Sequence, residues 1–170
     1  MARLTALKHR TLPAADEMAF GIVVSEGNVE IAAPILEEAV RTLREAGCPE
    51  HLIQIKYVPS FFDLAMGAQF FAEYTDVDAV LVLGCHLRSD SHPALVEGVM
   101  QGVMQVQQQW NMPCAWGVAD AETAEAAYAR YAEGDRTGAR AAASAIRMVR
   151  LQIDMEAASP NALPDQRNLN

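Results

Sequence analysis

The sequence predicts an α/β fold in which a four-stranded parallel sheet is covered by helices on both faces. Apolar runs rich in β-branched residues alternate along the chain with segments that repeat apolar residues at helical spacing. The run AVLVLGC at residues 79–85 is apolar throughout, which is typical of a strand buried on both faces of a sheet. Four consecutive strand-then-helix units favour parallel strands in a three-layer α/β/α arrangement.

The first half of the chain contains two of these units. We expect a strand over 18–25, a helix from Asn28 to Gly47, a strand over 51–58 and a helix over 61–74. The Asn28 side chain can accept a hydrogen bond from a free backbone N–H in the first helical turn. Gly47 can take the left-handed conformation that often ends a helix.

The second half contributes two more strands and three helices. Pro93 suits the first turn of a helix, where its missing N–H has no helical partner to lose. The expected elements are strands over 79–85 and 114–118, a polar loop over 86–92, and helices over 93–110, 120–132 and 136–155.

Length and composition limit the class of protein. The chain has 170 residues, 51% of them hydrophobic, which suits one domain over 18–156 between an N-terminal extension (1–17) and a polar C-terminal tail (157–170). A net charge of −9 argues against binding to a nucleic-acid backbone. Three widely spaced cysteines favour a reducing compartment, and no apolar run approaches the ~20 residues of a membrane span. We therefore expect a soluble, cytoplasmic protein that binds neither nucleic acid nor membrane.

Polar residues concentrate after the third predicted strand. The segment 85–92 brings a cation, a carboxylate, two hydroxyls and two imidazoles to the start of a helix. Ligands of open α/β sheets bind outside the carboxyl ends of the strands, so Arg88 and helix N–H groups could hold a phosphate-bearing substrate. A solvated loop with a helix cap is the alternative interpretation. His92 could act as a general acid or base, or lie on the surface without a chemical role.

We expect no metal and no nucleotide cofactor. The spacing of Cys85, His86, Asp90 and His92 matches no standard zinc motif, and neither GxxxxGK nor GxGxxG occurs. Trp116 follows a predicted strand, where it could pack in the core or stack on a flat ring.

Several motifs together resemble one known family. They are FGIVVS (20–25) followed by Asn28, Val58-Pro59, VLVLG (80–84), PCAWG (113–117) and the last two helices. In this order and spacing the chain, over about 18–155, resembles 6,7-dimethyl-8-ribityllumazine synthases. The resemblance implies a flavodoxin-like subunit that assembles as a homopentamer or an icosahedral 60-subunit shell. It also implies a cofactor-free transferase of riboflavin biosynthesis, which condenses 5-amino-6-(ribitylamino)uracil with 3,4-dihydroxy-2-butanone 4-phosphate and releases phosphate and water.

The resemblance also implies roles for particular residues. Asn28 and Asp63 would orient the uracil, Arg130 and Ser91 would hold the phosphate, and His92 would be the catalytic histidine. Trp116 would contact the substrate ring bound in the site of a neighbouring subunit. Further substrate contacts are expected along the two loops, at Phe61, Phe62, Cys85, His86, Leu87, Arg88 and Asp90.

The chain departs from the family pattern at several of these positions. Gly27 stands where an aromatic residue stacks on the pyrimidine, and Ser60 stands where a glycine is usual. The pattern Gly-x-Val-Ile-Arg becomes Gly84-Cys-His-Leu-Arg88, so that a histidine replaces the valine, and the loop that follows is two residues shorter. We favour a synthase. The alternative is a non-catalytic paralogue that serves as an oligomeric scaffold or binds a flavin or another ligand.

Overall fold

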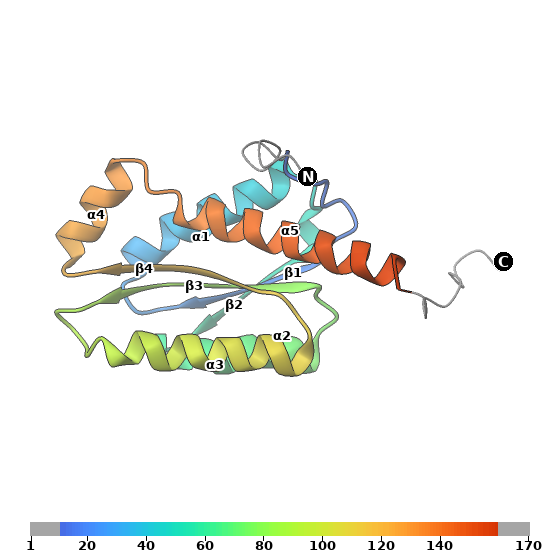
Figure 1. Ribbon diagram of the computed structural model, residues 1–170. Coiled ribbons are helices and arrows are strands. Elements are labelled where there is room, and N and C mark those ends of the chain that lie inside the picture. The colour runs from blue at the N-terminus through green and yellow to red at the C-terminus, as the bar shows by residue number, and fades with distance from the viewer. Residues whose placement is uncertain (1–10, 160–170) are drawn as a thin grey trace, which may run out of the picture.

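The computed structural model describes residues 11–159, and its four strands form one parallel sheet (Figure 1). The strand order is β2-β1-β3-β4, so the chain switches direction of winding between β1 and β3. The strands are β1 (Phe20–Ser25), β2 (Ile53–Val58), β3 (Ala79–Leu87) and β4 (Cys114–Ala121).

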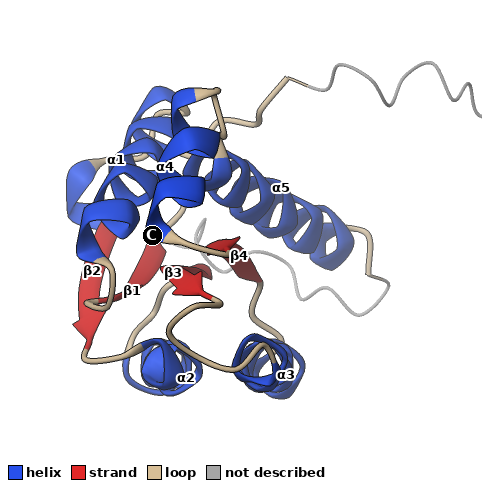
Figure 2. Ribbon diagram, turned by 90° about the vertical axis from the view of Figure 1, so that its left-hand side faces the viewer, coloured by secondary structure: helices blue, strands red, loops and turns tan. Residues whose placement is uncertain are grey.

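Helices cover both faces of this sheet, which confirms the predicted three-layer α/β/α fold (Figures 1 and 2). Two short 3-10 helices, η2 (Glu50–Leu52) and η3 (Phe61–Asp63), precede β2 and α2. One face carries α1 (Val29–Glu45), α4 (Ala124–Ala132) and α5 (Thr137–Ala157). The other carries α2 (Leu64–Tyr74) and α3 (Ala94–Trp110).

The sheet separates two apolar cores because successive side chains of a strand point to opposite faces. Leu81 and Leu83 of β3 are fully buried against α1 and α5, whereas Val80 and Val82 are fully buried against α2 and α3. All residues of β1 and β3 are buried, as the apolar runs predict.

Two strands extend further than the sequence predicts. We expected β3 to end at Cys85 and β4 to end at Val118, with a loop or helix following each. Instead the pairing continues through His86 with Asp120 to Leu87 with Ala121. Hydrogen bonds between neighbouring strands hold these residues extended, although the side chains of His86 and Asp120 are polar.

The structure confirms the predicted end of α1 but not the side-chain cap predicted at its start. Gly47 has a φ of 94°, which confirms it as the helix stop. The predicted side-chain cap at Asn28 is wrong, because this residue is itself left-handed, with φ 55° and ψ 43°, and its side chain caps no N–H. Its carbonyl oxygen instead accepts hydrogen bonds from the N–H groups of Ile31 and Ala32.

The described part of the predicted N-terminal extension packs on the domain. Ala15 is fully buried, and its N–H donates a 2.8 Å hydrogen bond to the Ala46 carbonyl. Residues 1–10 and 160–170, which include most of both predicted extensions, lie outside the described residues. Over residues 11–159, the structure contains no helix with both the length and the apolar character needed to cross a membrane.

A tight contact between Gly138 of α5 and the backbone of α1 leads to a stability prediction. A Cβ atom at Gly138 would collide with the backbone carbonyl of Ile35, and a backbone atom cannot rotate away. We therefore expect Gly138→Ala to lower the free energy of unfolding by about 1–3 kcal/mol in a urea titration. The control is Gly98→Ala, where a Cβ meets no atom within 4 Å and a gain of about 0.5–1 kcal/mol is expected. Equal effects of the two substitutions would contradict the helix contact.

Candidate active site

The polar and aromatic residues of interest gather at the carboxyl ends of the strands, the edge that faces the viewer in Figure 2. In sheets of this topology, ligands bind at this edge near the switch between β1 and β3. Alternation along β3 turns His86 to the same side as Val82, above α2 and α3. Trp116 and Asp120 of β4 share that side, and Asp120 is the register partner of His86.

Asp120 is the centre of a charged network. Its Oδ2 accepts a 2.7 Å hydrogen bond from Arg88 Nη2, and its Oδ1 accepts a 3.3 Å bond from Arg88 Nε. Oδ1 also lies 3.0 Å from His86 Nδ1. The hydrogen bond from Arg88, helped by the bond to His86 and the arginine charge, lowers the pKa of Asp120 below its ordinary value. An ionised carboxylate can only accept, so Nδ1 of His86 carries the proton.

His86 is buried between this network and an aromatic pair. Its side chain is 1% exposed, and the ring of Phe61 lies 5.5 Å away at a tilt of 50°. Phe61 in turn meets Trp116 edge to face at 6.3 Å. The Nε2 atom of His86 has no hydrogen-bond partner within residues 11–159, a situation that costs about 1–3 kcal/mol for a buried polar atom.

Arg130 reaches the same edge from α4. Its Nη1 donates a 2.9 Å hydrogen bond to the Asp120 carbonyl, and its Nη2 donates a 2.9 Å bond to Asp135 Oδ2. Asp135 also accepts from Thr137 and Arg140 at the start of α5. Two guanidinium groups, those of Arg88 and Arg130, therefore meet at one residue of β4.

Other predicted site residues make local contacts instead. Asp63 Oδ2 accepts hydrogen bonds from the N–H and hydroxyl of Ser60, which caps η3. Phe62 is 72% exposed and points away from the core. The usual glycine is not required at Ser60, because its φ of −139° lies in the extended region.

The loop before α3 is shorter than the sequence predicts, since His86 and Leu87 belong to β3. His92 is exposed, and its Nδ1 accepts a 3.1 Å hydrogen bond from the Ala94 N–H. Asp90 accepts a bond from the neighbouring Ser89 hydroxyl, and the Ser91 N–H donates to the Leu87 carbonyl. These residues form the turn that precedes α3.

Cys85 and Leu87 point to the opposite side of β3, into the core with α1 and α5. Burial, with the nearby charges of Asp120 and Asp90, raises the pKa of Cys85 to about 11, so the thiol stays protonated at neutral pH. Among the described residues, no group of three His, Cys, Asp or Glu side chains could hold a metal ion.

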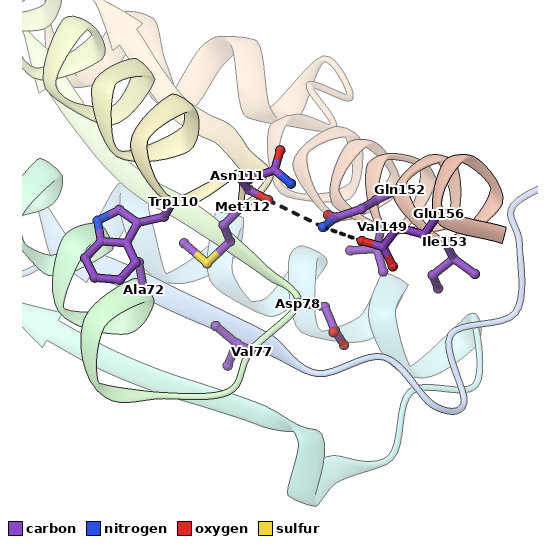
Figure 3. A pocket seen from close by; sticks show the side chains of 10 residues that line it. All are labelled: Ala72, Val77, Asp78, Trp110, Asn111, Met112, Val149, Gln152, Ile153 and Glu156. Atoms are coloured by element: carbon purple, nitrogen blue, oxygen red, sulfur yellow. Dashed lines mark hydrogen bonds between the residues drawn. The ribbon is translucent and has the colours of Figure 1, made fainter. Parts of the chain in front are cut away.

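Cavities lie at both edges of the sheet. At the carboxyl edge, Asn28 and Tyr128 border a cavity of about 280 Å³ between the starts of α1 and α4. Gly27 is exposed beside it, and a Cβ there would meet no atom within 4 Å. A second cavity of about 300 Å³ lies at the amino edge between the ends of α3 and α5 (Figure 3). It contains none of the predicted site residues.

Sequence reasoning missed Asp120, which we assigned to the start of a helix. The signal that could have found it is alternation, because Trp116, Val118 and Asp120 fall two residues apart and share one face of a strand. The polar segment after Val118 concealed that pattern.

Fold and site together define a doubly wound α/β protein with an arginine- and aromatic-lined site at the carboxyl edge of its sheet. Comparison with known proteins identifies the family. The family model for 6,7-dimethyl-8-ribityllumazine synthase matches residues 17–152, so the chain belongs to that family and the resemblance seen in its sequence is confirmed.

Individual relatives agree over most of the chain. The 6,7-dimethyl-8-ribityllumazine synthase of Parabacteroides distasonis is 36% identical over 151 residues, which is 86% of this chain and 93% of the relative. The enzyme of the same name from Halorhodospira halophila is 33% identical over 149 residues, covering 86% and 96%. That from Bacteroides fragilis is 38% identical over 112 residues, covering 65% and 78%.

The lowered pKa of Asp120 leads to a pH-dependent prediction. Its stabilising effect is present above the unfolded carboxyl pKa of about 3.9 and is lost as the pH falls through the lower folded value. Asp120→Asn should therefore cost about 1 kcal/mol of unfolding free energy at pH 7, and the difference from wild type should narrow as the pH falls below about 3.9, the ordinary carboxyl pKa.

Asp154→Asn is the matched control, because its ion pair with Arg150 is exposed on α5. Its effect at pH 7 should stay below about 0.5 kcal/mol. A deficit of Asp120→Asn that is the same at pH 7 and pH 3 would show that its carboxylate charge contributes nothing to stability.

Proposed function

We propose that this protein is a 6,7-dimethyl-8-ribityllumazine synthase. It would join 5-amino-6-(ribitylamino)uracil to 3,4-dihydroxy-2-butanone 4-phosphate, with loss of phosphate and water. The observation that carries the proposal is the family match over residues 17–152, supported by relatives of that name along most of their length. The position of the polar site at the carboxyl edge agrees with it.

In this proposal Arg88 and Arg130 form the phosphate-binding part of the site. Both guanidinium groups contact Asp120, one through the carboxylate and the other through the carbonyl. Each keeps N–H groups beyond the bonds described above, since a guanidinium has five donors in a planar fork. Planar donors of this kind suit a phosphate group, and the N–H groups at the start of α3, with Ser91, would add to them.

The aromatic side of the site would receive the uracil. Trp116 is half-buried and packs on Phe61 in its own subunit, leaving part of the indole for a ring substrate. Asn28, at the mouth of the neighbouring cavity, would orient the ring by hydrogen bonding. Most of the rate would come from holding the two substrates together.

We assign proton transfer during imine formation and phosphate loss to His92. Its Nδ1 accepts the Ala94 N–H, which leaves Nε2 of an exposed imidazole to exchange a proton with substrate or water. No metal or organic cofactor takes part in the proposed reaction.

The proposed enzyme is a homo-oligomer, a pentamer or a larger shell. Four apolar side chains of η3 and α2 recur every fourth residue, and each is at least half exposed: Phe62, Met66, Phe70 and Tyr74. We call this set the α2 stripe. A continuous apolar stripe of this length marks a protein interaction site, and a second copy of the chain is its proposed partner.

The function is tested by turnover. Purified protein is mixed with both substrates, and lumazine formation is followed by absorbance against the uncatalysed reaction. Formation above that background supports the proposal. A folded, homogeneous protein that leaves the rate unchanged would overturn it and would favour the scaffold or ligand-binding paralogue.

The role of Arg130 leads to a kinetic prediction. Arg130→Ala should raise the KM for the butanone phosphate by about tenfold to a hundredfold, because a charge-assisted contact contributes about 1.5–3 kcal/mol. The KM for the uracil should change less than threefold. Arg150→Ala, which removes an exposed arginine at the far end of α5, is the control and should alter neither. Equal increases for both substrates would remove Arg130 from the phosphate site.

The α2 stripe leads to a prediction about assembly. Phe70→Glu places a charge in the middle of the stripe, so the mass measured by sedimentation should fall to that of smaller species. Leu151→Glu, on exposed apolar surface of α5, should keep at least the pentamer. An unchanged mass for Phe70→Glu would exclude the stripe as the interface.

A further inference from the structure

We propose that His86 is a positioning residue, which holds Asp120 from inside the protein so that Arg88 presents its free edge to the phosphate-bearing substrate. The inference rests on the proposed function for the identity of that substrate. It concerns a position where the family pattern has valine, so the contact is a feature of this chain rather than of the pattern.

The burial of His86 excludes it from direct contact with substrate in this subunit. The side chain is 1% exposed and is covered by Phe61 on one side. Its Nε2 has no partner in the described part of the chain, so the fold gains nothing from that atom. The polar contact that remains is the Nδ1–H donated to Asp120 at 3.0 Å.

Asp120 is thereby held from two directions. His86 bonds Oδ1 from the buried side, and Arg88 bonds both carboxylate oxygens from the solvent side. The Phe61 ring packs against the imidazole, and the burial of the His86 side chain restricts its rotation, so that Nδ1–H keeps its direction toward Asp120. A carboxylate tied at its inner face cannot swing outward with the arginine.

The consequence for Arg88 follows from its geometry. Its Nε and Nη2 point to Asp120, so the planar guanidinium is oriented with Nη1 on the opposite, exposed side. The side chain is 49% exposed, and a free arginine at that exposure would sample many rotamers. The buried imidazole reduces this freedom through the carboxylate and leaves the substrate-facing donors in one place.

Two substitutions separate this role from simple packing. His86→Leu fills the buried space but donates no hydrogen bond. His86→Asn fills it less well, but its side-chain amide donates from nearly the position of Nδ1. A packing role predicts that leucine is the better replacement in every measurement. A positioning role predicts that leucine is better for thermal stability and asparagine is better for substrate binding.

The first experiment measures steady-state kinetics of both variants with both substrates. His86→Leu should raise the KM for the butanone phosphate by about tenfold and the KM for the uracil less than threefold, while its melting temperature is at least that of His86→Asn. His86→Asn should keep the phosphate KM within about threefold of wild type. The inference would be overturned if the KM of His86→Leu for the butanone phosphate equalled that of wild type. It would also be overturned if that KM were no higher than the KM of His86→Asn.

A second experiment separates this inference from the proposed function. Crystal structures of the wild-type and His86→Leu proteins show the Arg88–Asp120 pair without any need for turnover. The two-point contact should be present in wild type and lost or displaced in His86→Leu. An unchanged pair in His86→Leu would refute the positioning role even in an active enzyme. If the wild-type protein shows no turnover but the Arg88–Asp120 pair is lost in His86→Leu, the proposed function is refuted and the positioning role of His86 is not.

Discussion

The parallel pairing of β3 with β4 determines the arrangement of the whole carboxyl edge. Both strands continue beyond the apolar runs that predict them, to Leu87 and Ala121. Because the strands stay in register, His86 and Asp120 lie next to each other on the face of the sheet that α2 and α3 cover. A β4 that ended at Val118 would leave Asp120 in a loop. The imidazole and Arg88 would then share no fixed carboxylate.

The same pairing explains why polar side chains appear where they do. Residues of β1 and β3 are buried along the full length of both strands, and apolar cores fill both sides. A polar group within those layers would lack water and partners, which is costly. The strand ends are the first positions at which a side chain such as Asp120 can reach a cation from outside the sheet. Because the apolar core excludes unpaired polar groups, the binding site of a doubly wound fold lies at the ends of its strands.

These constraints also divide what the sequence could and could not predict. Apolar runs and helical spacing predicted the strands, the helices and the three-layer fold, because burial acts on every residue of an element. Strand ends were missed, since the extension of β4 depends on hydrogen bonds to β3 rather than on its own residues. Asp63 shows the local limit: its carboxylate caps η3, a contact that the sequence pattern did not reveal. The prediction that the Asn28 side chain caps α1 is wrong, because the backbone of that residue is left-handed.

The charge distribution explains how an acidic chain can offer a site for a phosphate ester. The net charge of −9 repels an anion at long range, but salt limits that repulsion to about 8 Å at physiological ionic strength. Within that distance the local charges determine the potential. Arg88 and Arg130 both contact Asp120, Arg88 through the carboxylate and Arg130 through the backbone carbonyl. Asp120 does not cancel them, because it occupies only one edge of the Arg88 guanidinium and leaves the outer edge to a ligand. The ion pair with Asp120 uses two N–H donors of Arg88 and thereby orients the remaining N–H groups of its guanidinium toward a ligand. The Asp120 carboxylate therefore reduces the positive potential of the site but also fixes the geometry of its donors.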